Sequence, residues 1–437
     1  MEKLNHAEVV NLLIQLSLML GIGRLLAELV RFFKQPAVVG EIIAGIILGP
    51  TILGAVSPDT FQWLFPASGP STIALDGFIQ LSVILLLFIA GLEVELHIVW
   101  QQGKQALLTS LFALGVPFII GFLTTYYYPG IFNLDANGEQ HLVFALFIGT
   151  TLAITALPVI ARILMDLSLF KSGMGMLIIA SAMINDLLGW LIFTVVLSMI
   201  GTTTGMAVWQ TVLLTIGFTL VTLTFGKGLI NKGLPWINRK MSWPGGVLSI
   251  AMAFCLLAAA FTEFIGIHAI FGAFIIGVAV GDSQHLTERA KEILHHFINN
   301  IFAPLFFVSI GLHINFVSSF DLGLVVAFIV LAFVGKVSGA YFGARKGGLE
   351  QPKALAVGFA MNTHGTLEVI LGAIALEEGL ISEEIFVAIL VMVIFTIVTS
   401  APLIRTCLQW QERTESAAVQ PQPQPQSPKP ESPATEP

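Results

Sequence analysis

Asp186 has the clearest capacity for chemistry in this chain, because it follows Asn185 at the centre of a long apolar segment, Gly173 to Ile200. A charged side chain at bilayer depth costs roughly 2.5–3.5 kcal/mol on insertion scales, and such residues mark ion or proton sites. The alternative is a carboxylate that a buried partner neutralises and that only packs. A carboxylate beside amide and hydroxyl oxygens suits a hard monovalent cation. We therefore take Asp186 as the candidate cation and proton site, with Asn185, Thr155 and Ser181 as candidate companions.

Three further residues place a charge or a titratable group in apolar segments: Lys336, His364 and Glu368. Lys336 can pair with Asp186 or Glu368 when no cation is bound. Glu368 can equally be a counter-charge that steadies the surrounding helices. His364 can tune a pH response or simply pack as a hydrogen-bonded histidine. We therefore treat these three as supporting charges.

Two apolar segments are interrupted by residues that disfavour a continuous helix. Five residues mark the interruptions: Thr151 and Pro158 in the first, and Asn362, Thr363 and Gly365 in the second. Proline removes a helix hydrogen bond, and threonine side chains can satisfy the freed backbone groups. The carbonyls and half-helix ends of such helices can hold a cation where two of them cross. The pattern predicts two crossed discontinuous helices, and two ordinary kinked helices are the alternative.

The composition places the chain in a bilayer. Of its 437 residues, 56% are hydrophobic and 11% charged, with a mean hydropathy of +0.88, which excludes a soluble domain of this size. Since a membrane helix needs about 20 mostly apolar residues, the chain offers about thirteen spans. They lie near 8–32, 37–54, 77–99, 105–127, 141–163, 173–200, 207–226, 245–265, 267–281, 298–316, 321–344, 353–376 and 384–408. The predicted fold class is an all-α integral membrane protein whose short second and ninth spans can be tilted or broken.

The basic residues indicate which side of the membrane each loop occupies. Of the 20 lysines and arginines, all except Lys3 and Lys336 fall at or beyond the ends of odd-numbered spans. Positive residues collect on the cytoplasmic side of a membrane protein. The sequence therefore predicts a multi-pass protein with its N-terminus outside and its C-terminus in the cytoplasm.

The spans contain an inverted repeat. Spans three and ten end alike, in Gly91-Leu92 and Gly311-Leu312, and spans two and nine share spaced glycines around paired isoleucines. Each pair is seven spans apart, and the same offset relates the interrupted spans, five and twelve. An odd offset makes the two copies antiparallel, which is typical of inverted-topology transporters. We expect six spans, one linker span and six spans, within a membrane domain at 1–413.

The end of the chain has a different composition. Residues 414–437 contain a Gln-Pro alternation from Gln420 to Gln426, which predicts a disordered, Pro-rich cytoplasmic tail. Docking of a partner on this tail is the alternative. No nucleotide-binding fingerprint follows the last span, so we expect no nucleotide-binding domain, no nucleic-acid partner and no cofactor. Cys255 and Cys407 lie in apolar segments and are interpreted as small core residues rather than disulfide or metal residues.

Three short segments carry a family resemblance: residues 155–164, Ile184-Asn185-Asp186 and residues 361–365. In this order on spans five, six and twelve, they resemble the monovalent cation:proton antiporter superfamily. The resemblance is greatest to the branch that holds bacterial Na+/H+ antiporters, the transport domains of potassium-efflux antiporters and plant cation/proton exchangers. It covers roughly residues 8–408.

The resemblance implies an inverted-repeat antiporter fold that works as an elevator, in a homodimer within the bilayer of a bacterial inner membrane. Spans 4–6 and 11–13 would form a core, spans 1–3 and 8–10 a dimerisation panel, and span 7 a linker. Asp186 would carry the ion, and Lys336 resembles the family's membrane lysine. Electrogenic relatives have two adjacent aspartates where this chain has Asn185-Asp186. This departure implies electroneutral exchange, although a membrane lysine often accompanies the paired aspartates.

These observations predict an antiporter, not an enzyme, that exchanges Na+ or K+ for H+ in pH homeostasis. A cation and a proton cannot share one carboxylate, so movement of one guest drives the other if only loaded forms cross. A sodium-coupled organic solute symporter of the same architecture is the main alternative, and it would need a roomier polar cavity. A channel and an intramembrane aspartyl protease are further alternatives, and the protease would need a second deep aspartate.

Overall fold

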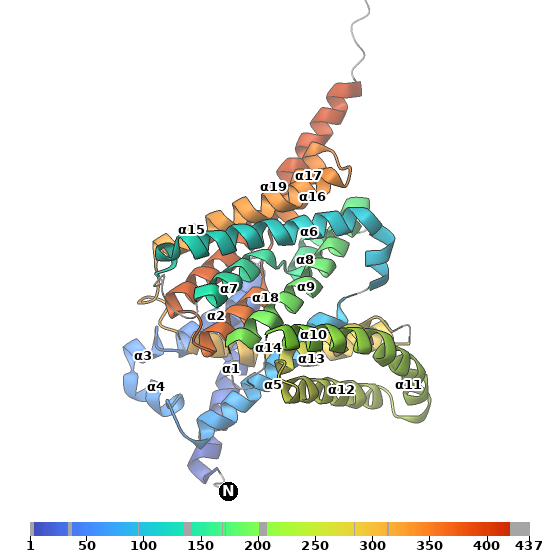
Figure 1. Ribbon diagram of the computed structural model, residues 1–437. Coiled ribbons are helices and arrows are strands. Elements are labelled where there is room, and N and C mark those ends of the chain that lie inside the picture. Colours follow the sequence, from blue (N-terminus) through green and yellow to red (C-terminus); the bar gives the residue numbers. More distant parts are fainter. Residues whose placement is uncertain are drawn as a thin grey trace, which may run out of the picture.

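The computed structural model describes residues 4–33, 37–94, 96–133, 141–167, 169–170, 172–200, 208–283, 285–312 and 314–419, and every regular element in these ranges is helical (Figure 1). The elements are α1 (His6–Phe32), α2 (Ala37–Leu48), α3 (Leu53–Val56), α4 (Pro58–Leu64), α5 (Pro70–Leu92), α6 (Leu96–Tyr127), η1 (Pro129–Phe132), α7 (His141–Ala153), α8 (Leu157–Asp166), α9 (Gly173–Ile200), α10 (Val208–Val221), η3 (Thr222–Gly226), α11 (Lys227–Lys240), α12 (Gly245–Phe264), α13 (Ala269–Gly281), α14 (Glu288–Leu312), α15 (Leu322–Ala332), η4 (Phe333–Val337), α16 (Ser338–Lys346), α17 (Gln351–Met361), α18 (Thr366–Glu377) and α19 (Glu383–Val419).

Ten helices in the described ranges are long and apolar enough to cross a membrane. The three predicted spans that are not among them correspond to shorter elements, namely α13 and the split pairs α7/α8 and α17/α18. In a bilayer, backbone groups must be hydrogen-bonded within the protein, which is why apolar spans become helices. The all-helical membrane fold is confirmed, whereas the exact count of thirteen spans stays a prediction.

The sequence misplaced several boundaries by one turn or more. Helix α5 begins at Pro70 and ends at Leu92, earlier than the predicted 77–99, because proline is favoured in the first turn of a helix. Helix α14 begins at Glu288, ten residues before its apolar part, since hydropathy does not detect polar helical turns. The tail was predicted to start at 414, whereas α19 continues to Val419. Residues 414–419 contain good helix formers, and the first proline of this region is Pro421. Residues 420–437 lie outside the described ranges.

The helices pack in two sets. The first helix set comprises α1, α2, α5, α12, α13 and α14, and the second comprises α6, α7, α9, α15, α16, α17 and α19. Helix α10 packs on α9 of the second set and continues into η3, which packs on α13 of the first. In Figure 1 the two sets lie one above the other, with α10 crossing in front of α14 and α13. The predicted linker span therefore contacts both sets.

The first helix set contains two symmetry-related helix pairs that meet through glycine. In the α2/α14 pair, a Cβ on Gly45 would lie 2.8 Å from the Cα of Gly311. In the α5/α13 pair, a Cβ on Gly91 would lie 3.0 Å from the Cα of Gly277. The two contacts relate spans two and ten to spans nine and three, as an inverted repeat requires. Small residues allow membrane helices this close approach, so the glycines hold the pairs together.

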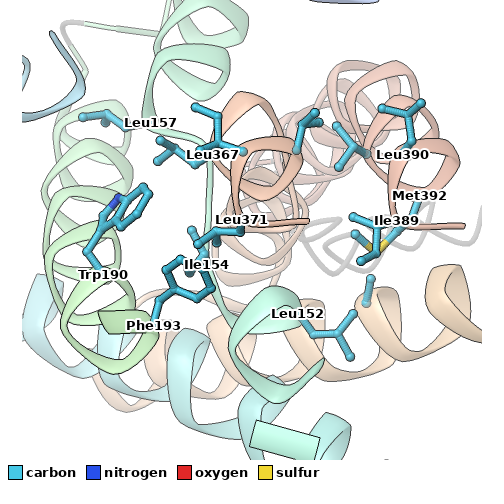
Figure 2. Close-up of a cluster of buried hydrophobic side chains, with 14 of the residues drawn as sticks. Leu152, Ile154, Leu157, Trp190, Phe193, Leu367, Leu371, Ile389, Leu390 and Met392 are labelled. Atoms are coloured by element: carbon cyan, nitrogen blue, oxygen red, sulfur yellow. The ribbon is translucent and has the colours of Figure 1, made fainter. Parts of the chain in front are cut away.

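The apolar core surrounds the two interrupted segments. Figure 2 shows buried side chains from four regions of the chain gathered together. They are Leu152, Ile154 and Leu157 around the first interruption, Trp190 and Phe193 of α9, Leu367 and Leu371 of α18, and Ile389, Leu390 and Met392 of α19. Close packing of these side chains supports the interrupted backbone.

Candidate cation and proton site at two interrupted helices

Both predicted interruptions are real breaks in the helices. Helix α7 ends at Ala153 and α8 begins at Leu157, whereas α17 ends at Met361 and α18 begins at Thr366. Pro158 lies in the first turn of α8, where a missing N–H leaves no helix hydrogen bond unmade. The proline therefore marks the start of the second half-helix rather than a kink within one helix.

Two hydrogen bonds to main-chain carbonyls join the two breaks. The Ala156 N–H donates to the Thr363 carbonyl oxygen at 2.9 Å, and the Thr155 hydroxyl donates to the Met361 carbonyl oxygen at 3.0 Å. Thr155 is fully buried, and its hydroxyl proton is used in this crossing bond. Its oxygen keeps a lone pair that can accept or coordinate. The crossing is thus held by backbone groups that sequence alone does not reveal.

Gly365 provides the room for this crossing. A Cβ at position 365 would lie 2.6 Å from the Ala156 Cβ and 2.9 Å from the Val159 Cγ2. Real Cβ atoms do not approach other carbons so closely, and neither neighbour is a flexible side-chain end. Any side chain at this position must therefore push the two breaks apart.

We expect Gly365→Ala to destabilise the protein by about 1–3 kcal/mol, because overpacking of a close contact forces the backbone to shift. A thermal melt of the purified protein in detergent would check this. Gly217→Ala on α10 is the matched control, since a Cβ there would meet nothing within 4 Å. Equal melting temperatures for the two variants would show that the crossing is not tightly packed.

Asp186 is 4% exposed and lies where α8 begins. The backbone N–H of Leu157, the first residue of α8, lies close enough to its carboxylate to stabilise the charged form. The N-terminus of a helix carries partial positive charge, so this position favours an anionic carboxylate. Within the described residues, Oδ1 of Asp186 has no hydrogen-bond partner, and neither does either polar atom of the buried Asn185 amide. The free oxygens of Asp186 and Asn185 can accept a hydrogen bond or coordinate a cation, whereas the Asn185 Nδ2 can only donate.

Lys336 is fully buried in the π-helical turn η4, which interrupts the eleventh span. Its ammonium group donates to the carbonyl oxygens of Ala153 and Ile154, the second at 2.9 Å. These carbonyls end the half-helix α7, where partial negative charge collects. In the part of the chain that the structure describes, Lys336 makes no ion pair with Asp186 or Glu368 within 4 Å. The ammonium group therefore contacts backbone carbonyls and does not form a direct ion pair with either carboxylate.

Glu368 closes the start of the other half-helix. Its Oε2 accepts the Gly365 N–H at 2.6 Å, which caps an otherwise unsatisfied donor of α18. Its Oε1 is buried and has no partner among the described atoms. Asp186, a residue of α9, lies at the N-terminal end of α8, and Glu368 lies at the N-terminal end of α18. The two carboxylates thus have corresponding positions at the second half of each interrupted span. This arrangement fits the supporting role expected of Glu368.

Helix α19 braces the second break through two hydroxyl groups. The Thr363 hydroxyl donates to the Ser400 oxygen at 2.9 Å, and the His364 N–H donates to the Thr396 oxygen at 3.4 Å. The His364 ring is fully buried, with Nδ1 3.1 Å from the Asn362 carbonyl oxygen. His364 therefore sits within the backbone framework of the break.

Three other predicted residues differ in their hydrogen-bond partners. Ser181 is buried, but its hydroxyl donates to the Ala106 carbonyl oxygen on α6 at 3.3 Å. Thr151 lies in the last turn of α7, and its buried hydroxyl has no partner within the described ranges. The side-chain oxygen of Asn362 is likewise buried without one. The structure thus leaves Thr151 and Asn362 with free oxygens near the breaks, whereas Ser181 is engaged with α6.

The family described as "Sodium/hydrogen exchanger, transmembrane" matches residues 17–410, a stretch that includes both interrupted helices and Asp186. The chain belongs to this sodium/hydrogen exchanger family. It is 33% identical over 402 residues to the Na(+)/H(+) antiporter NhaS4 of Synechocystis sp., covering 90% of this chain and 96% of that protein. It is 31% identical over 385 residues to the K(+)/H(+) antiporter 1 of Saccharomyces cerevisiae, covering 85% of this chain but 43% of that longer protein.

The fold also matches a solved exchanger. The sodium proton antiporter MjNhaP1 from Methanocaldococcus jannaschii superimposes with a TM-score of 0.61, covering 91% of this chain and 96% of that one. At 17% sequence identity this match concerns the fold alone. The resemblance drawn from the three short segments, and the inverted-repeat exchanger fold that it implied, are confirmed.

Sequence reasoning missed several residues of this exchanger that the structure places at the site. Gly189 is one: a Cβ there would lie 2.5 Å from the Ile154 side chain, so the glycine leaves space for the first break. Trp190 is another, one helical turn after Asp186, with its ring centroid 5.6 Å from that of Phe274 on α13. A glycine and a tryptophan one turn from a deep aspartate could have signalled both. Thr396 and Ser400, four residues apart on one face of an apolar helix, could have been found in the same way.

Proposed function

We propose that this exchanger moves Na+ or K+ in one direction across the membrane and H+ in the other, and that both guests bind at Asp186. The observation that carries the proposal is a buried carboxylate with a free oxygen, held at the crossing of two interrupted helices. The sodium/hydrogen exchanger family match supports it, as do the printed activities of NhaS4 and of K(+)/H(+) antiporter 1. Neither comparison supports the symporter alternative.

The proposed ligands of the cation are oxygens that lack other partners. The Asp186 carboxylate supplies the charge, and the Asn185 amide, the Thr151 hydroxyl and the Asn362 amide have buried oxygens without partners in the described chain. Thr155 can contribute its hydroxyl oxygen, whose lone pairs are not used when the hydroxyl donates to Met361. We leave Ser181 out of this set because its hydroxyl is bonded to α6. Oxygen ligands of this kind suit Na+ or K+ and give no site for a soft metal.

The fixed positive charge of Lys336 offsets one of the two nearby carboxylates, so a single bound cation or proton is enough to neutralise the site. The ammonium stays on the α7 carbonyls, while Asp186 and Glu368 lie near it at the half-helix ends. One cation or one proton then neutralises Asp186 in each crossing, which gives one-for-one, electroneutral exchange. Counter-transport follows if the core crosses only when Asp186 is loaded.

We propose alternating access by an elevator movement of the core against the panel. The second helix set, with α8 and α18, would form the core, and the first helix set would form the panel and the homodimer contact. Trp190 on α9 and Phe274 on α13 meet between the two sets, one turn beyond Asp186. These aromatic side chains can close the site on one side. The distribution of basic residues supports an outside N-terminus and a cytoplasmic C-terminus in a bacterial inner membrane.

The test of this proposal is cation-dependent collapse of an imposed pH gradient in proteoliposomes. Li+, Na+, K+ and Rb+ are compared in parallel, since the two relatives above are named for different cations. Saturable dissipation by one or two of these ions is expected. A flux that does not saturate and does not move protons would indicate a channel instead.

Competition at one carboxylate makes a further prediction. The apparent cation affinity should weaken as pH falls, approaching about tenfold per pH unit once Asp186 is mostly protonated, because the ligand must be deprotonated to bind. Isothermal titration of purified protein with the preferred cation, from pH 5 to pH 9, would measure this trend. An affinity that stays constant across this range would mean that cation and proton use separate sites.

A further inference from the structure

Helix α11 carries the positive charge of a long stretch without acidic residues. Between Asp186 and Glu263 the sequence contains no aspartate or glutamate. The basic residues of that stretch all lie on α11: Lys227, Lys232, Arg239 and Lys240. Charge of one sign on a single helix indicates a partner of the opposite sign.

The two faces of α11 differ sharply. Ile230, Leu234 and Ile237 form one face, which is buried against α12 and α13. The opposite face repeats at i, i+4, i+7 and i+8 and is exposed: Lys232, Trp236, Arg239 and Lys240. Trp236 is 61% exposed and lies between Lys232 and Arg239 along this face. The exposed face of α11 thus combines three cations with an indole.

The length of the helix places this face at the membrane surface. Val208–Lys240 runs through α10, η3 and α11 without a break, which is about 50 Å of helix at 1.5 Å per residue. The hydrocarbon core is about 30 Å thick, so the last turns of α11 extend past it. Trp236 and Trp243 are both exposed there, and tryptophan is typical of the headgroup level. Figure 1 shows α11 at the edge of the molecule, between α10 and α12.

We propose that the exposed face of α11 binds the phosphate headgroups of anionic phospholipids in the cytoplasmic leaflet. Lys232, Arg239 and Lys240 supply charge-assisted donors for phosphate oxygens, and the Trp236 indole packs on the acyl region beneath. The ligand is a lipid, because the cations surround an exposed aromatic side chain at headgroup depth. The site takes its orientation from the proposed membrane topology and does not depend on the ion chemistry at Asp186.

The bound headgroup would act on the first helix set. Lys227 pairs with Asp282 at 2.5 Å, and the Ser283 hydroxyl lies 2.5 Å from the Asn231 side-chain oxygen. Both contacts tie α11 to the end of α13. A headgroup that holds α11 in place therefore also stabilises the cytoplasmic end of α13 and the α5/α13 pair.

The test compares melting temperatures of the purified full chain in detergent with added phosphatidylglycerol or phosphatidylcholine. Phosphatidylglycerol is expected to raise the melting temperature by several degrees more than phosphatidylcholine. Lys232→Gln/Arg239→Gln should lose this increment. Lys104→Gln/Arg405→Gln, which removes the same charge from exposed positions on α6 and α19, should keep it. The exchange of Lys232→Arg/Arg239→Lys, which conserves charge, should keep it too.

Three outcomes would overturn the proposal. An undiminished increment in Lys232→Gln/Arg239→Gln would exclude α11 as the site, and an equal loss in the Lys104/Arg405 control would indicate general charge screening. An equal rise with inorganic phosphate would show a simple anion site rather than a lipid surface. If the double variant does not purify, Lys232→Gln and Arg239→Gln are measured singly, and an undiminished increment in both counts against the proposal. Because the readout is thermal stability, its failure would leave the exchange activity at Asp186 untouched.

Discussion

Asp186→Asn is expected to abolish cation-dependent dissipation of the pH gradient, down to the level of protein-free liposomes. The amide has nearly the shape of the carboxylate, but it cannot take up the proton or balance the charge of a cation. Because Asp186 is buried at the N-terminal end of α8, bulk water is not available there to balance the charge of a cation in its place. The fold should persist, since removing a buried charge relieves its desolvation cost.

The control for this variant is Asp59→Asn, the same chemical change at an exposed position on α4. It should exchange at the wild-type rate. The melting temperature of Asp186→Asn is measured alongside, so that loss of activity is separated from loss of fold. Undiminished exchange by a folded Asp186→Asn protein would defeat the assignment of the site.

Lys336→Met is expected to lower the stability of the protein by about 2–5 kcal/mol, because two buried carbonyls of the first break lose their donor. Methionine fills a similar volume and does not replace the hydrogen bonds to Ala153 and Ile154. Loss of the ammonium should also shift the pH profile of exchange, since Asp186 and Glu368 would face each other without a nearby positive charge. Thermal unfolding in detergent and the liposome assay at several pH values would measure the two effects.

Lys346→Met is the matched control, because Lys346 is exposed at the end of α16, with its ammonium 4.5 Å from the centre of the Phe112 ring. A cation–π contact at an exposed site contributes about 0.5–1 kcal/mol, so this variant should be close to wild type. A Lys336→Met protein of normal stability that no longer binds the cation would give Lys336 a direct part in coordination, against the present proposal.

The breaks at 154–156 and 362–365 could be predicted from sequence because their causes are local. Proline at 158 and glycine at 365 disfavour a continuous helix wherever they stand in lipid, and a lone Asp186 in an apolar segment needs no alignment to be noticed. The inverted repeat was also visible, although the structure pairs Gly45 with Gly311 and Gly91 with Gly277, a register that glycine spacing alone did not give.

Contacts between distant segments could not be predicted in the same way. The sequence allowed Lys336 to pair with a carboxylate, and in the structure it donates to main-chain carbonyls, which carry no sequence signature. Ser181 and Asp186 lie in one helix, but their side chains point in different directions. Only the packing of α6 against this helix shows that the Ser181 hydroxyl bonds to α6. Polar turns such as the start of α14 and the end of α19 were missed because hydropathy is blind to them.

The glycine contacts of α2/α14 and α5/α13 have a mechanical consequence. With main chain against main chain, no side chain lies between the partners that could change rotamer and let one helix slip along the other. Each helix pair therefore moves as one rigid unit, so the first helix set contains fewer independent units than helices. The proposed elevator movement would therefore displace the two helix sets along contacts such as that of Trp190 with Phe274, where side chain packs on side chain.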